Sequence, residues 1–222
     1  MQHALIILIA VLTATGVAGA ESYTSIPAAP IAIPDGNANP IFDSIDTSVD
    51  FGAGDTVTFV SIDLMIDHTW VGDLEIVLRS PGGVELTLMA RPGDNQPEGD
   101  FEDPWGSGAD FVSSNPITFI DSGPTSAEAM GSVNVVGGDI LASSYFPDRN
   151  GWDSDIDTFA EFVGDPAAGL WELQIQDYAN LDTGDLVSWT LNILAIPEPS
   201  TGVLLGLGLL GLAGGERWSA RR

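Results

Sequence analysis

Apolar residues occur at every second position in four separate stretches of this chain, mostly with polar residues between them. The sequence reads LEIVLR at 74–79, VELTL at 84–88, WELQIQ at 171–176 and WTLNI at 189–193. A period of two places the apolar side chains on one face of a β-strand. No convincing amphipathic helix lies between these stretches, and residues 92–116 are rich in Gly, Asp, Pro and Asn. The alternation therefore predicts an all-β protein.

Turn sequences predict how these strands are connected. SPGG at 80–83 separates the first two stretches and predicts a hairpin, and DTGD at 182–185 predicts a second paired set between the last two. Near Phe59 the alternation shifts by one residue, which predicts a β-bulge. Many short strands joined by turns favour an antiparallel β-sandwich, closed in jelly-roll fashion. The residues that we expect in its core are Trp171, Trp189, Leu74, Ile76, Leu86 and Leu88. We expect Gly72, Asp73 and Gly82 to set the turn geometry.

Both ends of the chain have the composition of targeting segments. Residues 4–14 form an apolar run that is too short to span a bilayer, and a small-residue cleavage pattern ending in Ala18 and Ala20 follows it. We therefore predict a secretory signal peptide over 1–20, cleaved after Ala20. The alternative is a retained N-terminal anchor. Between the signal and the folded domain, expected at 33–196, residues 21–32 are predicted to form a spacer.

The C-terminal end, residues 197–222, begins with Pro197, Glu198 and Pro199, continues into a short Gly/Leu-rich apolar segment and ends with arginines. The arginines would remain on the cytoplasmic side of a membrane. This tail resembles the PEP-CTERM sorting signal of exopolysaccharide-producing Gram-negative bacteria, with the three named residues as its motif. The resemblance implies export across the inner membrane, transient membrane insertion, removal of the tail by an exosortase-type enzyme, and delivery to the cell surface or extracellular matrix. A plain C-terminal anchor is the alternative.

Between residues 21 and 196 the chain is strongly acidic. Only three of its six basic residues fall there, whereas every acidic residue except Glu198 and Glu216 does. Nucleic acid is excluded as a partner, because phosphate contacts need a basic face. Three roles remain for the acidic residues: they are calcium ligands, they keep the protein soluble at the cell surface, or they adapt it to a salty medium. The chain has no cysteine, so it folds without disulfides.

Calcium is the cofactor that this composition favours, because a hard cation takes six to eight oxygen ligands from carboxylates, amides and carbonyls. The candidate ligands are Asp94, Asn95, Asp100 and Asp103 in the long loop, Asp153, Asp155 and Asp157 in WDSDIDT, and Asp67, Asp73 and Asp177 if the two hairpins pack side by side. WDSDIDT is not an EF-hand loop, because Thr158 stands where the glycine is required. Each acidic group has an alternative role as a solvated loop.

Several short sequence motifs follow one another in a characteristic order along the chain. HTWVGDL at 68–74 is followed by VLRSPGG at 77–83, and the other matching motifs, in chain order, are IPD at 33–35, RPGDN at 91–95, FED at 101–103, GLWEL at 169–173, DTGDL at 182–186 and SWTLNI at 188–193. Together they resemble the P domain, or Homo B domain, which follows the subtilisin-like catalytic domain in proprotein convertases and many bacterial proteases. The sequence departs from that pattern at Glu102, where bacterial members have Asp, and at Val71, where convertases have a basic residue.

A catalytic function of its own is not expected. After signal removal His68 is the single histidine, and it adjoins a strand end with no Gly-x-Ser-x-Gly elbow nearby. We expect it to hydrogen-bond to loop backbone instead. Zinc is disfavoured because a closed site needs several Cys or His ligands. No carboxylate pair stands out for glycosidase chemistry, and the residues outside the targeting segments leave no room for a subtilisin-like domain.

Three functions remain. We expect a secreted, surface-sorted P-domain module that stabilises or binds another exported protein or matrix material, with calcium as a stabilising ion. A carbohydrate-binding jelly roll is the first alternative, in which Trp70, Trp105 and Trp152 would stack on a matrix polysaccharide. An accessory domain of a separately encoded subtilisin-like serine endopeptidase is the second. Its proteolytic activity would belong to that partner and not to this chain.

Overall fold

The computed structural model describes residues 19–36, 39–93, 106–136, 138–149 and 157–197. β-Strands are its main regular elements, as the alternation predicts; two of them, β4 and β13, are 14 residues long, and the helical elements are single turns. In chain order the elements are β1 (Gly19–Ser25), β2 (Ile31–Ile33), β3 (Ile41–Asp46), β4 (Asp55–His68), η1 (Val71–Asp73), β5 (Leu74–Arg79), β6 (Glu85–Ala90), β7 (Ile117–Phe119), β8 (Thr125–Ser126), η2 (Ala127–Ala129), β9 (Val135–Val136), β10 (Asp139–Ile140), β11 (Ser143–Phe146), η3 (Phe159–Phe162), β12 (Leu170–Asp177) and β13 (Gly184–Pro197).

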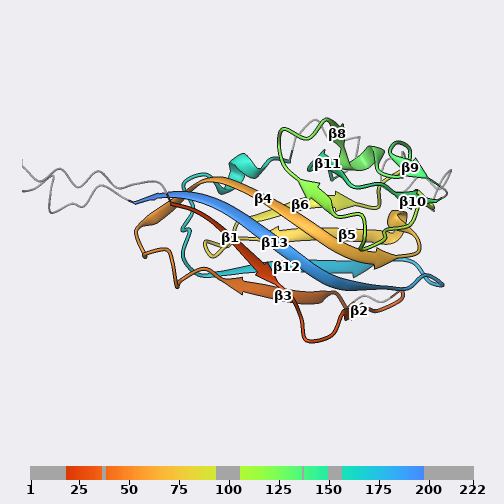
Figure 1. The fold of residues 1–222 in the computed structure, drawn as a ribbon, viewed down its shortest axis with the longest axis horizontal. Coiled ribbons are helices and arrows are strands. Elements are labelled where there is room, and N and C mark those ends of the chain that lie inside the picture. Colours follow the sequence, from red (N-terminus) through yellow and green to blue (C-terminus); the bar gives the residue numbers. More distant parts are fainter. Residues whose placement is uncertain (1–18, 37–38, 94–105, 137, 150–156, 198–222) are drawn as a thin grey trace, which may run out of the picture.

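Two sheets form the body of the molecule (Figure 1). The larger one, sheet A, has the order β1-β13-β4-β7-β11-β8, and β2 also pairs with β13. The smaller one, sheet B, has the order β3-β12-β5-β6, and β9 and β10 form a separate pair. Most neighbours are antiparallel, and β11 runs parallel to β7 and β8. The predicted all-β, antiparallel sandwich is confirmed.

The inward faces of the two sheets carry the apolar residues that the period of two selects. In β12, Trp171, Leu173 and Ile175 are fully buried and alternate with half-buried polar residues. The Trp171 ring meets Phe162 of η3 edge-on, with 5.2 Å between ring centroids, a favoured aromatic geometry. All six predicted core residues, namely Trp171, Trp189, Leu74, Ile76, Leu86 and Leu88, are at most 1% exposed. The core prediction is therefore confirmed.

The first predicted hairpin and the predicted bulge are both present. β5 pairs with β6 across the turn at 80–83, in which Gly83 takes a φ of +89° that favours glycine. Gly82 lies against Asp165, because a Cβ there would come within 2.3 Å of its carboxylate. Opposite β13, β4 carries one extra residue, Thr58, between the pairs formed by Val57 and Phe59. This is the bulge that the phase shift indicates.

The prediction of a second hairpin at the C-terminal end was wrong. β12 pairs with β3 and β5 in sheet B, whereas β13 pairs with β1, β2 and β4 in sheet A. Residues 178–183 therefore cross from one sheet to the other. Both strands alternate and both face the same core, and a turn sequence alone does not distinguish a hairpin from such a crossing.

The segment 21–32, expected as a spacer, belongs largely to the sheet. β1 pairs along its whole length with the end of β13, and β2 pairs with the beginning of β13. The β1 sequence is mostly small and polar, and only Tyr23 is seen packing on the core. Its weak alternation explains why the strand was missed. β1 and β13 are antiparallel, so Gly19 and Pro197 lie at the same end of sheet A (Figure 1).

Candidate functional site

A buried histidine lies where β4 ends. The His68 side chain is fully buried, and its Nε2 atom lies 3.3 Å from Oδ2 of the equally buried Asp177. Its Nδ1 atom contacts the Trp70 backbone, 3.3 Å from the amide nitrogen and 3.1 Å from the carbonyl oxygen. Nε2 faces the carboxylate, and Nδ1 either donates to the Trp70 carbonyl oxygen or accepts the Trp70 N–H, depending on the tautomer. The expected bond from His68 to loop backbone is therefore present.

The β4 and β13 strands approach each other closely beside this histidine. A Cβ on Gly184, the first residue of β13, would lie 2.2 Å from the Asp67 carbonyl oxygen and 2.5 Å from the His68 ring. Only glycine permits this approach. The glycine of the DTGD motif thus allows β13 to pack closely against β4 and the His68 ring, and the motif does not close a hairpin.

A second buried carboxylate, Asp73, stands near Asp177. Asp73 is the last residue of η1 and is 2% exposed, and its carbonyl oxygen accepts the Tyr178 N–H at 2.9 Å. Burial raises the pKa of Asp73 to about 6, and repulsion from Asp177 and Asp182 adds to the rise, while the Arg91 guanidinium offsets part of it. His68 of β4 and Asp177 of β12 thus form a buried pair, and the buried carboxylate of Asp73 in η1 is repelled by the charge of Asp177.

The predicted calcium ligands lie in different surroundings. Asp73 and Asp177 are both buried, and repulsion between their charges contributes to the raised pKa of Asp73. Asp67 is directed elsewhere, because adjacent residues of a strand point to opposite faces, and its Oδ1 accepts the Ser113 N–H at 2.6 Å. The proposed grouping of Asp67 with the other two was wrong for this reason. Asp94, Asn95, Asp100, Asp103, Asp153 and Asp155 lie outside the described residues. Among the described residues, no group of three or more His, Asp or Glu side chains is arranged to hold a metal ion.

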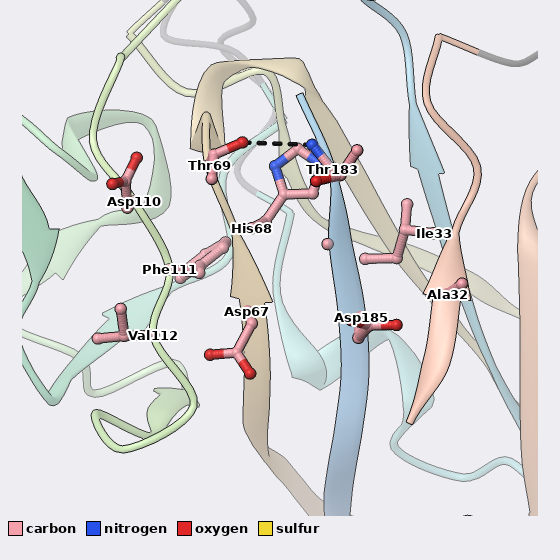
Figure 2. A pocket seen from close by; sticks show the side chains of 11 residues that line it. Ala32, Ile33, Asp67, His68, Thr69, Asp110, Phe111, Val112, Thr183 and Asp185 are labelled. Carbon is pink, nitrogen blue, oxygen red and sulfur yellow. Dashed lines mark hydrogen bonds between the residues drawn. The ribbon is translucent and has the colours of Figure 1, made fainter. Parts of the chain in front are cut away.

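An acidic surface cavity of about 450 Å³ borders the histidine (Figure 2). Asp67, Asp110 and Asp185 line it together with Ile33 and Phe111. Burial raises the pKa of the Asp110 carboxyl, and Asp139 and Asp182 act in the same direction. The His68 side chain takes no part in the open surface, because it is 0% exposed. Sequence analysis missed this cavity, since its lining comes from distant segments that share no motif.

The turn glycine Gly72 holds η1 against the loop at 106–107. A Cβ on Gly72 would lie 2.5 Å from the Ser107 amide nitrogen, and the Gly72 N–H donates to the Ser107 carbonyl oxygen at 2.9 Å. Trp70 packs beside it, because its ring lies within 3 Å of where a Gly108 Cβ would stand. Trp70 is therefore half-buried against backbone. Trp105 and Trp152, the other tryptophans considered for sugar binding, lie outside the described residues.

The predicted processing sites fall at the edge of the described chain. Pro197 is the last residue of β13, whereas Glu198 and Pro199 lie outside the described residues. At the other end Ala18 is outside them, and Ala20 belongs to β1 and pairs with Leu194. Cleavage after Ala20 would leave Glu21–Ser25 of this strand. No helix in the described part of the chain is long and apolar enough to cross a membrane.

Comparisons with known proteins match two regions of the chain. The family profile described as the proprotein convertase P-domain matches residues 57–115 and 141–193, and the PEP-CTERM protein-sorting motif matches residues 195–217. No curated protein matches the chain.

Among solved structures, a serine protease of Aeromonas sobria is similar over 79% of this chain, with 17% identity and a TM-score of 0.41. The complex of that protease with its chaperone ORF2 is similar over 80%, with the same identity and TM-score. The chain spans about a quarter (26%) of the length of the matched protease chains.

Proposed function

Since the chain belongs to the proprotein convertase P-domain family, we propose that it is an exported, surface-sorted module without catalysis of its own, which stabilises another exported protein. The observation that carries this proposal is the burial of His68. A general base must reach the proton that it abstracts, and this imidazole is enclosed between Asp177 and the Trp70 backbone. The side chain supports a loop and offers nothing to a substrate.

Two assays test the module. The purified protein is expected to show no turnover of peptide or glycoside substrates, and a turnover that His68→Ala abolishes would contradict the proposal. In the second assay, an exported subtilisin-like protease from the same cells, one that lacks this domain, is heated with and without the protein. Slower inactivation is expected with the protein and not with an unrelated protein of similar acidity. Equal inactivation rates would leave the stabilising role without support.

The sorting step is tested at the motif. Replacement of Pro197, Glu198 and Pro199 by alanine is expected to leave residues 198–222 attached in a Gram-negative host that encodes an exosortase, whereas Ser200→Ala serves as the control. Mass spectrometry of the envelope and extracellular fractions reads out the result. Equal processing of both variants would show that the motif does not direct removal of the tail.

We also propose that calcium binds at Asp73 and Asp177. Both carboxylates are buried, and repulsion between their charges contributes to the raised pKa of Asp73. This supports a cation there, because a divalent ion would offset the repulsion and supply the positive charge that the two carboxylates lack. Two carboxylates are too few for a complete site, so backbone carbonyls and loop oxygens must complete it. With a dissociation constant near 10⁻⁴ M, about millimolar calcium would add roughly 1.4 kcal/mol. Thermal unfolding with and without chelator measures the stabilisation by calcium. If the Tm difference between the two conditions disappears in Asp73→Asn but persists in Asp185→Asn, the ion binds at Asp73.

A further inference from the structure

The outer face of sheet A ends in an apolar patch, which we define as Ala20, Phe59, Leu194 and Ile196. Leu194 of β13 pairs with Ala20 of β1 and with Phe59 of β4, and directly opposed residues project from the same face of a sheet. Ile196 follows two positions along β13, on that same face. Ile193 and Ala195, which alternate with them, are 2% exposed and point into the core. Phe59 and Ile196 are 41% and 45% exposed.

The neighbouring rows of the same face are polar. Ser22, Asn192 and Ser61 form the next row, and Thr24, Thr190, Asp63 and Thr118 form the row after it. These side chains bond to one another: Ser22 donates to Asn192 at 2.6 Å, Asn192 to Asp63 at 3.1 Å and Thr118 to Asp63 at 2.5 Å. The apolar side chains of these three rows are therefore confined to one end of the face.

That end is where the C-terminal tail leaves the domain. β13 continues as a paired strand up to Pro197, opposite Asp55, and residue 198 follows it directly in the sequence. Only residues 198–200 separate Pro197 from the apolar segment that begins at Thr201. Even fully extended, this connection spans at most about 14 Å. A tail inserted in a bilayer would hold the end of sheet A close to the headgroup layer, which is roughly 5–8 Å thick.

We propose that the apolar patch rests on the surface of the bilayer while the tail is inserted, so that the domain is held by a sheet face as well as by its tether. This inference rests on the proposed sorting function. Partly exposed Phe, Leu and Ile side chains gain free energy when they enter the interfacial region. A second copy of the chain is a poorer occupant, because a formal net charge of −26 opposes close approach of two acidic domains. For the same reason the surface is expected to be zwitterionic rather than anionic lipid.

The absence of cysteine from the chain makes a direct test available. Phe59→Cys, Ile196→Cys and the control Thr190→Cys, each in the full chain, are labelled with a polarity-sensitive fluorophore and reconstituted into phosphatidylcholine vesicles that contain a nitroxide at headgroup depth. Thr190 lies on the polar part of the same face. Labels at 59 and 196 are expected to shift their emission to shorter wavelength and to lose intensity to the nitroxide, whereas the label at 190 keeps both. Two labelled positions guard against a folding defect in one variant.

Flotation of the vesicles separates the two proposals. Protein that does not float with the vesicles overturns both the tail insertion and the patch contact. Protein that floats, with labels at 59 and 196 no more quenched than the label at 190, overturns the patch contact alone. A blue shift that appears in detergent without lipid and grows with protein concentration identifies a second copy as the occupant and also overturns it.

Discussion

Replacement of Asp73 by asparagine is expected to stabilise the protein at neutral pH and to flatten the pH dependence of its stability. In the folded state the pKa of this carboxyl is about 6, compared with its usual 3.8. Well below pH 3.8 the group is neutral in both the folded and the unfolded chain and has no effect. As the pH rises from 4 to 6 the unfolded chain loses this proton first, so the folded state loses stability, and above pH 6 the full loss is present.

The magnitude follows from the two pKa values. Each pKa unit corresponds to 1.36 kcal/mol, so the loss at pH 7 is roughly 3 kcal/mol. Asparagine has nearly the same shape and stays neutral, so the variant avoids this loss. For a domain of about this size, 1 kcal/mol shifts the Tm by roughly 2–4 °C, which predicts a Tm higher by roughly 6–12 °C at pH 7 and little difference at pH 4.

Thermal unfolding in chelator at several pH values between 4 and 7.5 measures the difference between the wild type and Asp73→Asn. Asp185→Asn is the control, because it also removes one negative charge but leaves the buried group intact. Parallel curves for the wild type and Asp73→Asn would refute the reasoning, as would a variant that is less stable at pH 7. Added calcium is expected to reduce the difference in Tm between the wild type and Asp73→Asn, because the ion offsets the repulsion between Asp73 and the neighbouring carboxylates.

Three further changes test the packing. Trp171→Ala empties a fully buried position and is expected to cost about 3–5 kcal/mol in urea unfolding, because it leaves a large cavity. Gly72→Ala places a Cβ 2.5 Å from a backbone atom and is expected to destabilise the protein more than Gly83→Ala. A Cβ at Gly83 meets nothing within 4 Å, so that variant costs about 1–2 kcal/mol through its positive φ alone. Equal losses of stability in the two variants would contradict this expectation. Asp43→Ala removes the acceptor of the Trp189 N–H at 2.8 Å, which joins the two sheets, and is expected to cost roughly 1.5–3 kcal/mol.

Local patterns in the chain were enough to predict the alternating strands β5, β6, β12 and β13 and the core residues, although not the weakly alternating β1. Alternation in residues 74–79 and 171–176 identifies strands because each strand buries one face, and that rule needs only neighbours in the sequence. The bulge beside Phe59 was visible for the same reason, as a shift in that phase. The P-domain motifs around His68 also pointed to the family and to a supporting role for this histidine.

Relations between distant segments required the tertiary structure. Only the fold shows that β12 and β13 belong to different sheets, since two strands that face one core have the same alternation in either arrangement. Likewise, Asp67 and Asp73 are equally acidic in the sequence. The fold directs one toward a surface cavity and buries the other near Asp177, where the pKa rises. Burial and charge proximity depend on every segment that packs around a group, and no local pattern encodes that sum.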